Sequence, residues 1–251
     1  MSFKWQIGLC AASLGCSYGA DDLHIQPESG PDWSCVGQGA PLRSTDAIDL
    51  ELRVRNLPSN ELLQNVTGTA CADISCTPPV AVAEGVNGVL HFPQMDPMFR
   101  GSIELRSPEQ MSAIVDLLRP IGAMRELPEL RMLTKMAFEK YAEVGSGKTL
   151  DQTLGHALFW VVDCAGKRAP GVSFVPVDKV APNTQGYYAS DMELPSINLD
   201  RTKEHGGGGM INLPPGFPQF RAVLAEDQTV IAEFPTLIIA DTITFFLIEP
   251  E

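Results

Sequence analysis

Apolar and polar residues alternate along residues 48–55, where Ile48, Leu50, Leu52 and Val54 are separated by charged residues. A period of two places one set of side chains in a core and the other in solvent, which predicts a half-buried antiparallel strand. Further short apolar segments, separated by turn residues, predict strands at 66–72, 80–83, 89–92 and 102–106. Several short strands at this spacing are typical of a β-sandwich, which we expect over residues 35–106.

The pattern changes after residue 106. Ser107-Pro108-Glu109-Gln110 has the composition of a helix start with a capping box, and apolar residues follow at helical spacing as far as Leu118. A second start near Leu127-Pro128 precedes another apolar face, which reaches Tyr141 and ends at Gly145. Residues 107–145 are therefore expected to form a pair of short helices that links two β regions.

Strand patterns return in residues 150–251. Residues 156–163 are a nearly unbroken apolar run, which predicts a strand buried on both faces. Further strands are expected at 171–177, 210–213, 219–225, 230–234 and 242–248. The predicted fold is therefore mainly β, with two antiparallel β-sandwiches joined by a short helical pair.

The first 16 residues have the proportions of a signal peptide. A positive charge at Lys4 precedes an apolar stretch too short to span a membrane, and Ser13-Leu14-Gly15-Cys16 then resembles a lipobox, although Ser13 stands where leucine is usual. We expect Cys16 to carry the lipid and the polar residues 17–34 to form a tether. The alternative is an ordinary cleaved signal or a disordered start. The expected location is extracytoplasmic: an outer-membrane or cell-surface lipoprotein, or a periplasmic or secreted protein if Cys16 is not acylated.

The cysteine count fits an exported chain. If Cys10 and Cys16 belong to the leader and its processing site, four cysteines remain, an even number that allows three pairings. Cys71 and Cys76 flank a short loop and can pair locally, which leaves Cys35 with Cys164. A four-cysteine zinc site is the alternative, but no second CxxC or pair of histidines accompanies these residues. We expect two disulfides and no metal site.

The charge balance narrows the range of partners. The chain has 18 basic and 31 acidic residues, a formal net charge of −13, which repels phosphate backbones and anionic headgroups. We therefore expect no nucleic-acid partner, and contact with a membrane only through a lipid anchor.

Two segments resemble catalytic motifs without completing them. Residues 145–149 end like a phosphate-binding loop but follow a predicted helix, so a helix C-cap and turn is the preferred interpretation. Residues 205–209, His-Gly-Gly-Gly-Gly, resemble an oxyanion-hole segment, but the mature chain has no GxSxG elbow. Four glycines are more simply explained by a flexible hairpin connection. We expect no catalytic residues and no cofactor, and we retain a serine esterase only as a remote alternative.

Several short motifs resemble one family, the bacterial cell-surface lipoproteins that carry carboxypeptidase-regulatory-like (transthyretin-like) β-sandwich domains. The matching motifs are Trp33-Ser34-Cys35-Val36-Gly37, Cys71-Ala72-Asp73-Ile74-Ser75-Cys76, Asp163-Cys164-Ala165-Gly166 with Ala169-Pro170-Gly171-Val172, and Asn212-Leu213-Pro214-Pro215-Gly216. The resemblance implies immunoglobulin/transthyretin-like sandwiches without a catalytic centre. The turn near Leu57-Pro58 and residues 205–209 depart from the family pattern.

The functional expectation is a non-catalytic, lipid-anchored protein of the cell envelope that acts in binding, adhesion or scaffolding, with an unknown envelope or extracellular protein or glycan as partner. The alternative is an accessory module that binds carbohydrate or peptide. In that case Tyr187 and Tyr188, or Trp160, are the aromatic residues expected to contact the ligand.

Overall fold

The computed structural model describes residues 30–250, except 40, 58, 125–129 and 191–193. The expected signal peptide, Cys16 and most of the tether lie outside the described residues. No helix within the described part of the chain is long and apolar enough to cross a membrane.

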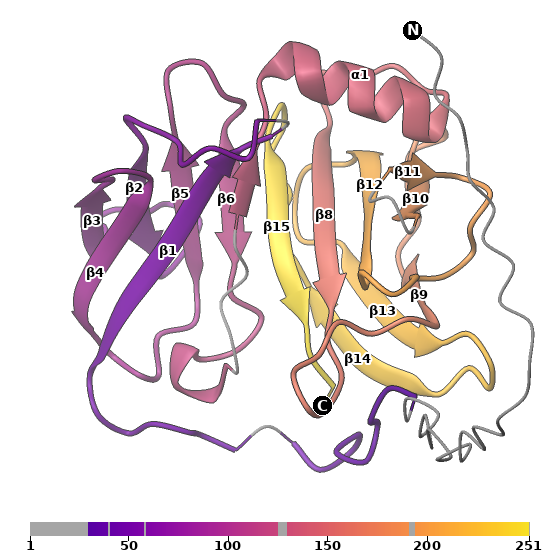
Figure 1. Cartoon of the computed structure of the whole chain (residues 1–251), viewed down its shortest axis with the longest axis horizontal. Coiled ribbons are helices and arrows are strands. Elements are labelled where there is room, and N and C mark those ends of the chain that lie inside the picture. The colour runs from indigo at the N-terminus through magenta and orange to yellow at the C-terminus, as the bar shows by residue number, and fades with distance from the viewer. Residues whose placement is uncertain (1–29, 40, 58, 125–129, 191–193, 251) are drawn as a thin grey trace, which may run out of the picture. The chain divides into compact units, whose positions relative to one another are not determined.

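The largest element is a nine-stranded sheet that runs through both halves of the chain (Figure 1). Its strands, in spatial order, are β11 (Pro195–Ser196), β10 (Gln185–Ala189), β12 (Gly207–Leu213), β8 (Gly155–Val161), β15 (Ile243–Ile248), β6 (Ala113–Asp116), β5 (Ser102–Arg106), β2 (Thr67–Cys71) and β3 (Ala81–Glu84). β15 is parallel to both of its neighbours, and the other pairs are antiparallel. The C-terminal strand thus joins the two halves by main-chain hydrogen bonds.

Two three-stranded sheets complete the β structure. One has the order β4 (Val89–Met95), β1 (Ile48–Asn56) and β7 (Leu130–Met132), and the other has the order β14 (Val230–Pro235), β13 (Gln219–Leu224) and β9 (Val172–Pro176). The described helices are α1 (Lys135–Ser146) and a 3₁₀ turn at Ile121–Ala123.

The nine-stranded sheet has a hydrophobic core on each face. Phe245 belongs to the core formed with the β4-β1-β7 sheet and α1, whereas Phe246 belongs to the core formed with the β14-β13-β9 sheet. Successive side chains of a strand point to opposite faces, so these adjacent residues of β15 lie in different cores. Each small sheet therefore packs on a different face of the large one, as two β-sandwiches that share a layer.

The mainly β prediction is confirmed, but the expected helical pair is wrong. In the segment expected to form the first helix, residues 113–116 instead form the strand β6, which lies between β5 and β15. In the segment expected to form the second helix, only the described residues of α1 are helical. The apolar residues from Met111 to Leu118 match a helical period, yet Ala113, Ile114 and Val115 are all buried, which is the pattern of a central strand.

The boundaries of α1 follow its capping residues. The Thr134 hydroxyl accepts a hydrogen bond from the Ala137 amide, and Gly147 closes the helix with a φ of 66°. The helix begins at Lys135 and ends beyond the expected stop at Gly145, and the expected start at Leu127-Pro128 lies outside the described residues. The segment at 145–149 contains the end of α1, in agreement with the predicted helix C-cap and turn and not with a phosphate-binding loop.

Both expected disulfides are confirmed. Cys35 pairs with Cys164 at a Cα–Cα distance of 5.7 Å, and Cys71 pairs with Cys76 at 4.7 Å. Around the first bridge, the Asp32 carbonyl accepts a hydrogen bond from the Cys164 amide (2.7 Å), and Trp33 packs against the second core. The last residues of the expected tether are therefore fixed to the sandwich.

A buried ion pair ties down the C-terminal segment. Arg119 donates to the Glu249 carboxylate (2.9 Å) and to the carbonyls of Glu249 (2.8 Å) and Pro250 (2.7 Å). The Glu249 side chain is 2% exposed, so this guanidinium supplies the countercharge that a buried carboxylate requires.

Candidate functional site

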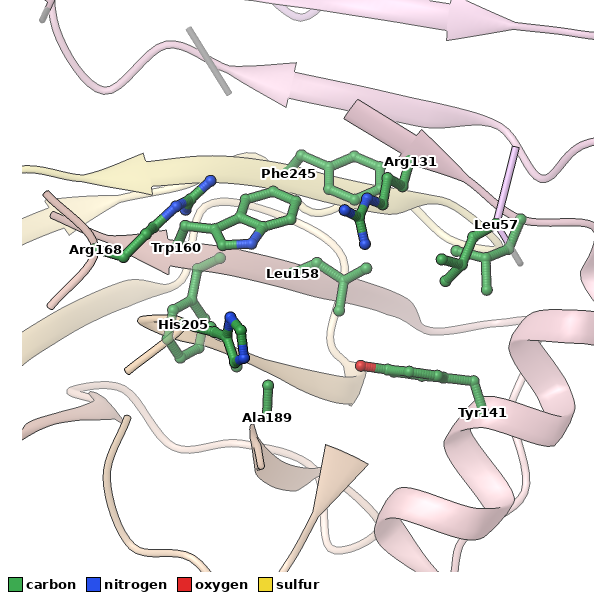
Figure 2. A pocket seen from close by; sticks show the side chains of 13 residues that line it. Leu57, Arg131, Tyr141, Leu158, Trp160, Arg168, Ala189, His205 and Phe245 are labelled. Carbon is green, nitrogen blue, oxygen red and sulfur yellow. The ribbon is translucent and has the colours of Figure 1, made fainter. Parts of the chain in front are cut away.

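A pocket with a cavity volume of about 200 Å³ opens on the face of the large sheet that carries Trp160 (Figure 2). Its floor comes from β8, β12 and β15, and its walls come from α1, β7 and the residue that follows β1. The lining residues are Leu57, Arg131, Leu133, Tyr141, Leu158, Phe159, Trp160, Arg168, Ala189, His205, Gly207, Gly208 and Phe245. Leu158 and Trp160 are half-buried here, whereas Phe159 between them is buried in the other core.

The Trp160 indole is fixed by its neighbours. It stacks with Phe245 at an interplanar angle of 12° and a centroid distance of 5.9 Å, and the Arg168 guanidinium carbon lies 5.2 Å from the indole centroid. Such a cation–π contact stabilises both groups by about 0.5–1 kcal/mol at an exposed site. A held indole presents its Nε1–H edge in one orientation, and Figure 2 shows that edge turned toward the cavity.

The glycines of β12 provide the space beside Trp160. A Cβ atom on Gly207 would stand 3.8 Å from the indole Nε1 and 3.5 Å from the Ala189 Cβ, which are ordinary contact distances. Any larger side chain at Gly207 would occupy the cavity. The pocket therefore depends on the missing side chain at this position.

Hydrogen-bond donors surround the cavity. Figure 2 shows the Arg131 guanidinium and the Tyr141 hydroxyl at one end of it, with His205 on the opposite side. Arg168 adds a second guanidinium, and no carboxylate belongs to the described residues that line the pocket.

The two tyrosines expected to contact a ligand are in the core. Tyr187 is 1% exposed and Tyr188 is 9% exposed, so neither ring lies at the surface where the alternative function would place it. They occupy consecutive positions of β10 and face opposite cores. Burial raises the pKa of the Tyr187 hydroxyl well above its usual value, and the Tyr188 hydroxyl accepts a hydrogen bond from the Phe174 amide (2.9 Å). Of the three aromatic candidates, Trp160 alone lines the pocket.

Of the four glycines expected in a flexible hairpin, Gly206 lies in the preceding turn with a φ of 61°, and Gly207–Gly209 begin the strand β12. β12 lies between β10 and β8, where Gly208 pairs with Phe159 and Tyr188, and Gly209 pairs with Leu158 and Tyr187. Large aromatic side chains press against these glycines: a Cβ on Gly209 would lie 2.5 Å from the Tyr187 hydroxyl. Glycine is required because the flanking rings occupy the space of its missing side chain.

This geometry also bears on the esterase alternative. An oxyanion hole needs main-chain amides directed at a substrate, but the glycines of β12 belong to an interior strand with ladders on both sides. No serine is among the described residues that line the pocket next to His205.

The cysteine sulfurs are bonded in pairs. Glu104 lies near Cys71 and Cys76, and the three could in principle form a ligand group. A disulfide offers no thiolate, however, which is the form of cysteine that binds zinc. Cys16 lies outside the described residues, so its acylation stays a prediction.

Comparison with known proteins leaves the family open. No protein-family model matches the chain, and no curated protein matches it. Among solved structures, it is similar to the TIE protein of Bacillus anthracis (TM-score 0.24, 12% identity, 82% of this chain and 34% of that one). It is also similar to a streptococcal ancillary pilin (TM-score 0.26, 14% identity, 81% and 69%) and to a mutant of the shaft pilin SpaA of Lactobacillus rhamnosus GG (TM-score 0.24, 12% identity, 82% and 99%). The chain spans about a third of the TIE protein chain, and TM-scores this low carry no argument about function.

Proposed function

We propose that the protein is an exported, non-catalytic binding protein of the cell envelope, anchored through Cys16, and that its pocket beside Trp160 receives one group of an envelope or extracellular partner. The pocket is the observation that carries this proposal, because it combines a held aromatic ring, an apolar wall and several convergent donors in one concave site.

The disulfides support a location outside the cytoplasm. Disulfides persist in oxidising compartments and are rare where thiol reductants are abundant. The chain has two, and one of them joins residues 129 positions apart. Adhesion and scaffolding are the roles compatible with a rigid β scaffold that carries one small recognition pocket.

Binding at the pocket is tested with a panel of envelope-derived peptides and glycans presented to the folded protein. Gly207→Leu fills the cavity, whereas Gly207→Ala adds a methyl group at ordinary contact distance and serves as the matched control. We expect panel members to bind the native protein and the alanine variant, and to be lost with the leucine variant. Binding that survives Gly207→Leu in a folded protein would place the recognition site elsewhere.

Export and anchoring are tested separately. In cells that produce the full chain, Cys16→Ser should release the protein from the membrane fraction, because the lipid can no longer be attached. A variant that stays bound to the membrane would contradict the anchor without affecting the pocket.

A further inference from the structure

The edge strands of the described sheets differ in how easily another strand could pair with them. Proline has no main-chain N–H to donate, and it is present in four of these edge strands: β4 (Pro93), β9 (Pro176), β11 (Pro195) and β14 (Pro235). β7 has only three residues. β3, which ends the nine-stranded sheet, has four residues and no proline. It is therefore the described edge strand most open to pairing with another polypeptide.

The ladder between β2 and β3 determines which main-chain groups of β3 face outward. The Gly85 amide donates to the Val66 carbonyl (2.7 Å), which continues the antiparallel register of the two strands. In such a ladder, pairs that exchange hydrogen bonds alternate with pairs whose main-chain groups point to the other side. Ala83 therefore also faces β2, whereas Val82 and Glu84 direct their N–H and C=O groups to the outer edge of the sheet, where Figure 1 shows β3.

The side chains of β3 that share the face opposite the first core are exposed. Val82 is 63% exposed, and Glu84, two positions along the same face, is exposed as well. On β2, Thr69 lies opposite Val82. Thr67 lies opposite Glu84. A strand added beyond β3 would extend both rows, so a β-branched residue beside Val82 and a cation beside Glu84 would form favourable cross-strand pairs.

Charge favours a basic strand over a second copy of the protein. A net charge of −13 on each copy opposes self-association and attracts a basic partner. Along the row of Glu84 and Thr67, the next residue is Arg106, whose guanidinium is paired with Glu104 (3.0 Å). A lysine on an added strand would therefore meet the Glu84 carboxylate before it meets this cation.

We propose that β3 binds an extended basic segment of a partner polypeptide as an additional strand of the large sheet. The main-chain groups of Val82 and Glu84 bind the segment, a β-branched residue packs beside Val82, and a lysine or arginine pairs with Glu84. This surface is separate from the pocket beside Trp160, because β12 and β8 lie near the other end of the same sheet. The inference goes beyond the proposed function and does not depend on it.

The test uses two peptides with blocked ends, Thr-Lys-Thr-Val-Thr-Lys-Thr and Thr-Glu-Thr-Val-Thr-Glu-Thr, titrated into the intact protein and followed by NMR. An ionic strength of about 0.15 M screens charges farther than about 8 Å from the peptide. We expect a Kd on the order of 1 mM for the basic peptide and about threefold weaker binding of the acidic one. Saturating basic peptide should slow hydrogen exchange of the Val82 and Glu84 amides by at least about tenfold, and should leave the Ala83 amide, which already faces β2, unchanged.

Variants locate the effect on β3. Glu84→Lys should abolish the preference for the basic peptide. Glu51→Lys makes the same charge change at an exposed position of β1 and is the matched control, which should keep the preference. Val82→Pro removes an N–H that β2 does not use and should abolish binding, whereas Val82→Thr keeps that N–H and the β-branched shape and should retain binding.

Each contrary outcome overturns a stated part of the inference. Equal binding of the two peptides, or a preference lost in Glu51→Lys as well, would overturn the basic partner. Peptide binding without slower exchange at Val82 and Glu84 would overturn strand pairing. No binding of either peptide, with protection of these amides that increases with protein concentration, would identify a second copy as the occupant and overturn the proposal. None of these results changes the outcome expected for Gly207→Leu at the pocket, so the two proposals fail independently.

Discussion

Removal of the Cys35–Cys164 disulfide should destabilise the protein much more than removal of the Cys71–Cys76 disulfide. A cross-link lowers the entropy of the unfolded chain by an amount that increases with the logarithm of the loop it closes. The sequence separations are 129 and 5 residues. The chain-entropy relation gives about 5 kcal/mol for the long loop and about 2 kcal/mol for the short one. In the native state, the long bridge also fixes the segment that contains Trp33 against the second core.

The assay is equilibrium urea unfolding of two double variants, Cys35→Ala with Cys164→Ala and Cys71→Ala with Cys76→Ala. The free energy of unfolding in water should decrease in both, with the first variant lower than the second by about 3 kcal/mol. Each variant is the control for the other, because both lose two sulfur atoms. Equal losses would refute the entropic argument, and a larger loss from the short loop would show that its native contacts dominate.

Three further predictions concern buried groups. Burial lowers the pKa of His156 from 6.5 to about 4, so the unfolded chain takes up the proton at a higher pH than the folded protein does, and the free energy of unfolding should fall as the pH decreases from 6.5 to 4. In urea titrations, His156→Gln should remove about 3 kcal/mol of this pH dependence, and identical pH profiles of the variant and the native protein would contradict the prediction. Gly209→Ala should destabilise by about 1–3 kcal/mol because its Cβ meets a buried tyrosine hydroxyl, whereas Gly207→Ala should be tolerated, and equal melting temperatures would refute this difference. Arg119→Met should lower the free energy of unfolding by about 3–5 kcal/mol, because it removes the guanidinium that pairs with the buried Glu249 carboxylate. In the same unfolding assay, the double variant with Glu249→Leu should recover much of that loss.

The strands that the sequence predicts are those whose burial follows their local pattern. The alternation at 48–55 corresponds to β1, whose odd and even positions differ in exposure, and residues 102–106 are β5. Two of the strands that the sequence does not predict, β6 and β11, lack this alternating pattern. β6 is buried on both faces and its spacing also fits a helix, and β11 has only two residues. Periodicity cannot distinguish a short central strand from a buried helix, because long-range pairing with β15 decides the outcome.

The sheet that the two sandwiches share could not be predicted from local sequence patterns. Its central connection is the parallel pairing of β15 with β6 and β8, which joins Ile243 to Ala113, 243 − 113 = 130 positions away, and to His156, 243 − 156 = 87 positions away. Two separated sandwiches and two fused ones require the same alternation in each strand. The domain boundaries at 35–106 and 150–251 therefore remain a prediction, while the two hydrophobic cores agree with two sandwich layers.

The pocket was only partly predictable. The sequence points to Trp160 as an aromatic candidate, but Arg131 and Tyr141 come from segments that it predicts to be a helical linker. The glycines at 207–209 suggested flexibility, whereas the structure uses them as space between aromatic rings. The structural role of these glycines depends on the side chains that pack against them, and those side chains come from other strands.

The most direct test of a recognition pocket beside Trp160 is an NMR map of the backbone amide and indole signals that shift when the tightest-binding member of the envelope panel is added. We predict that the shifted signals cluster at Gly207, Gly208, Ala189, Tyr141 and the Trp160 indole, which line the cavity. Saturable shifts confined to a different surface, with these signals unchanged, would contradict the account.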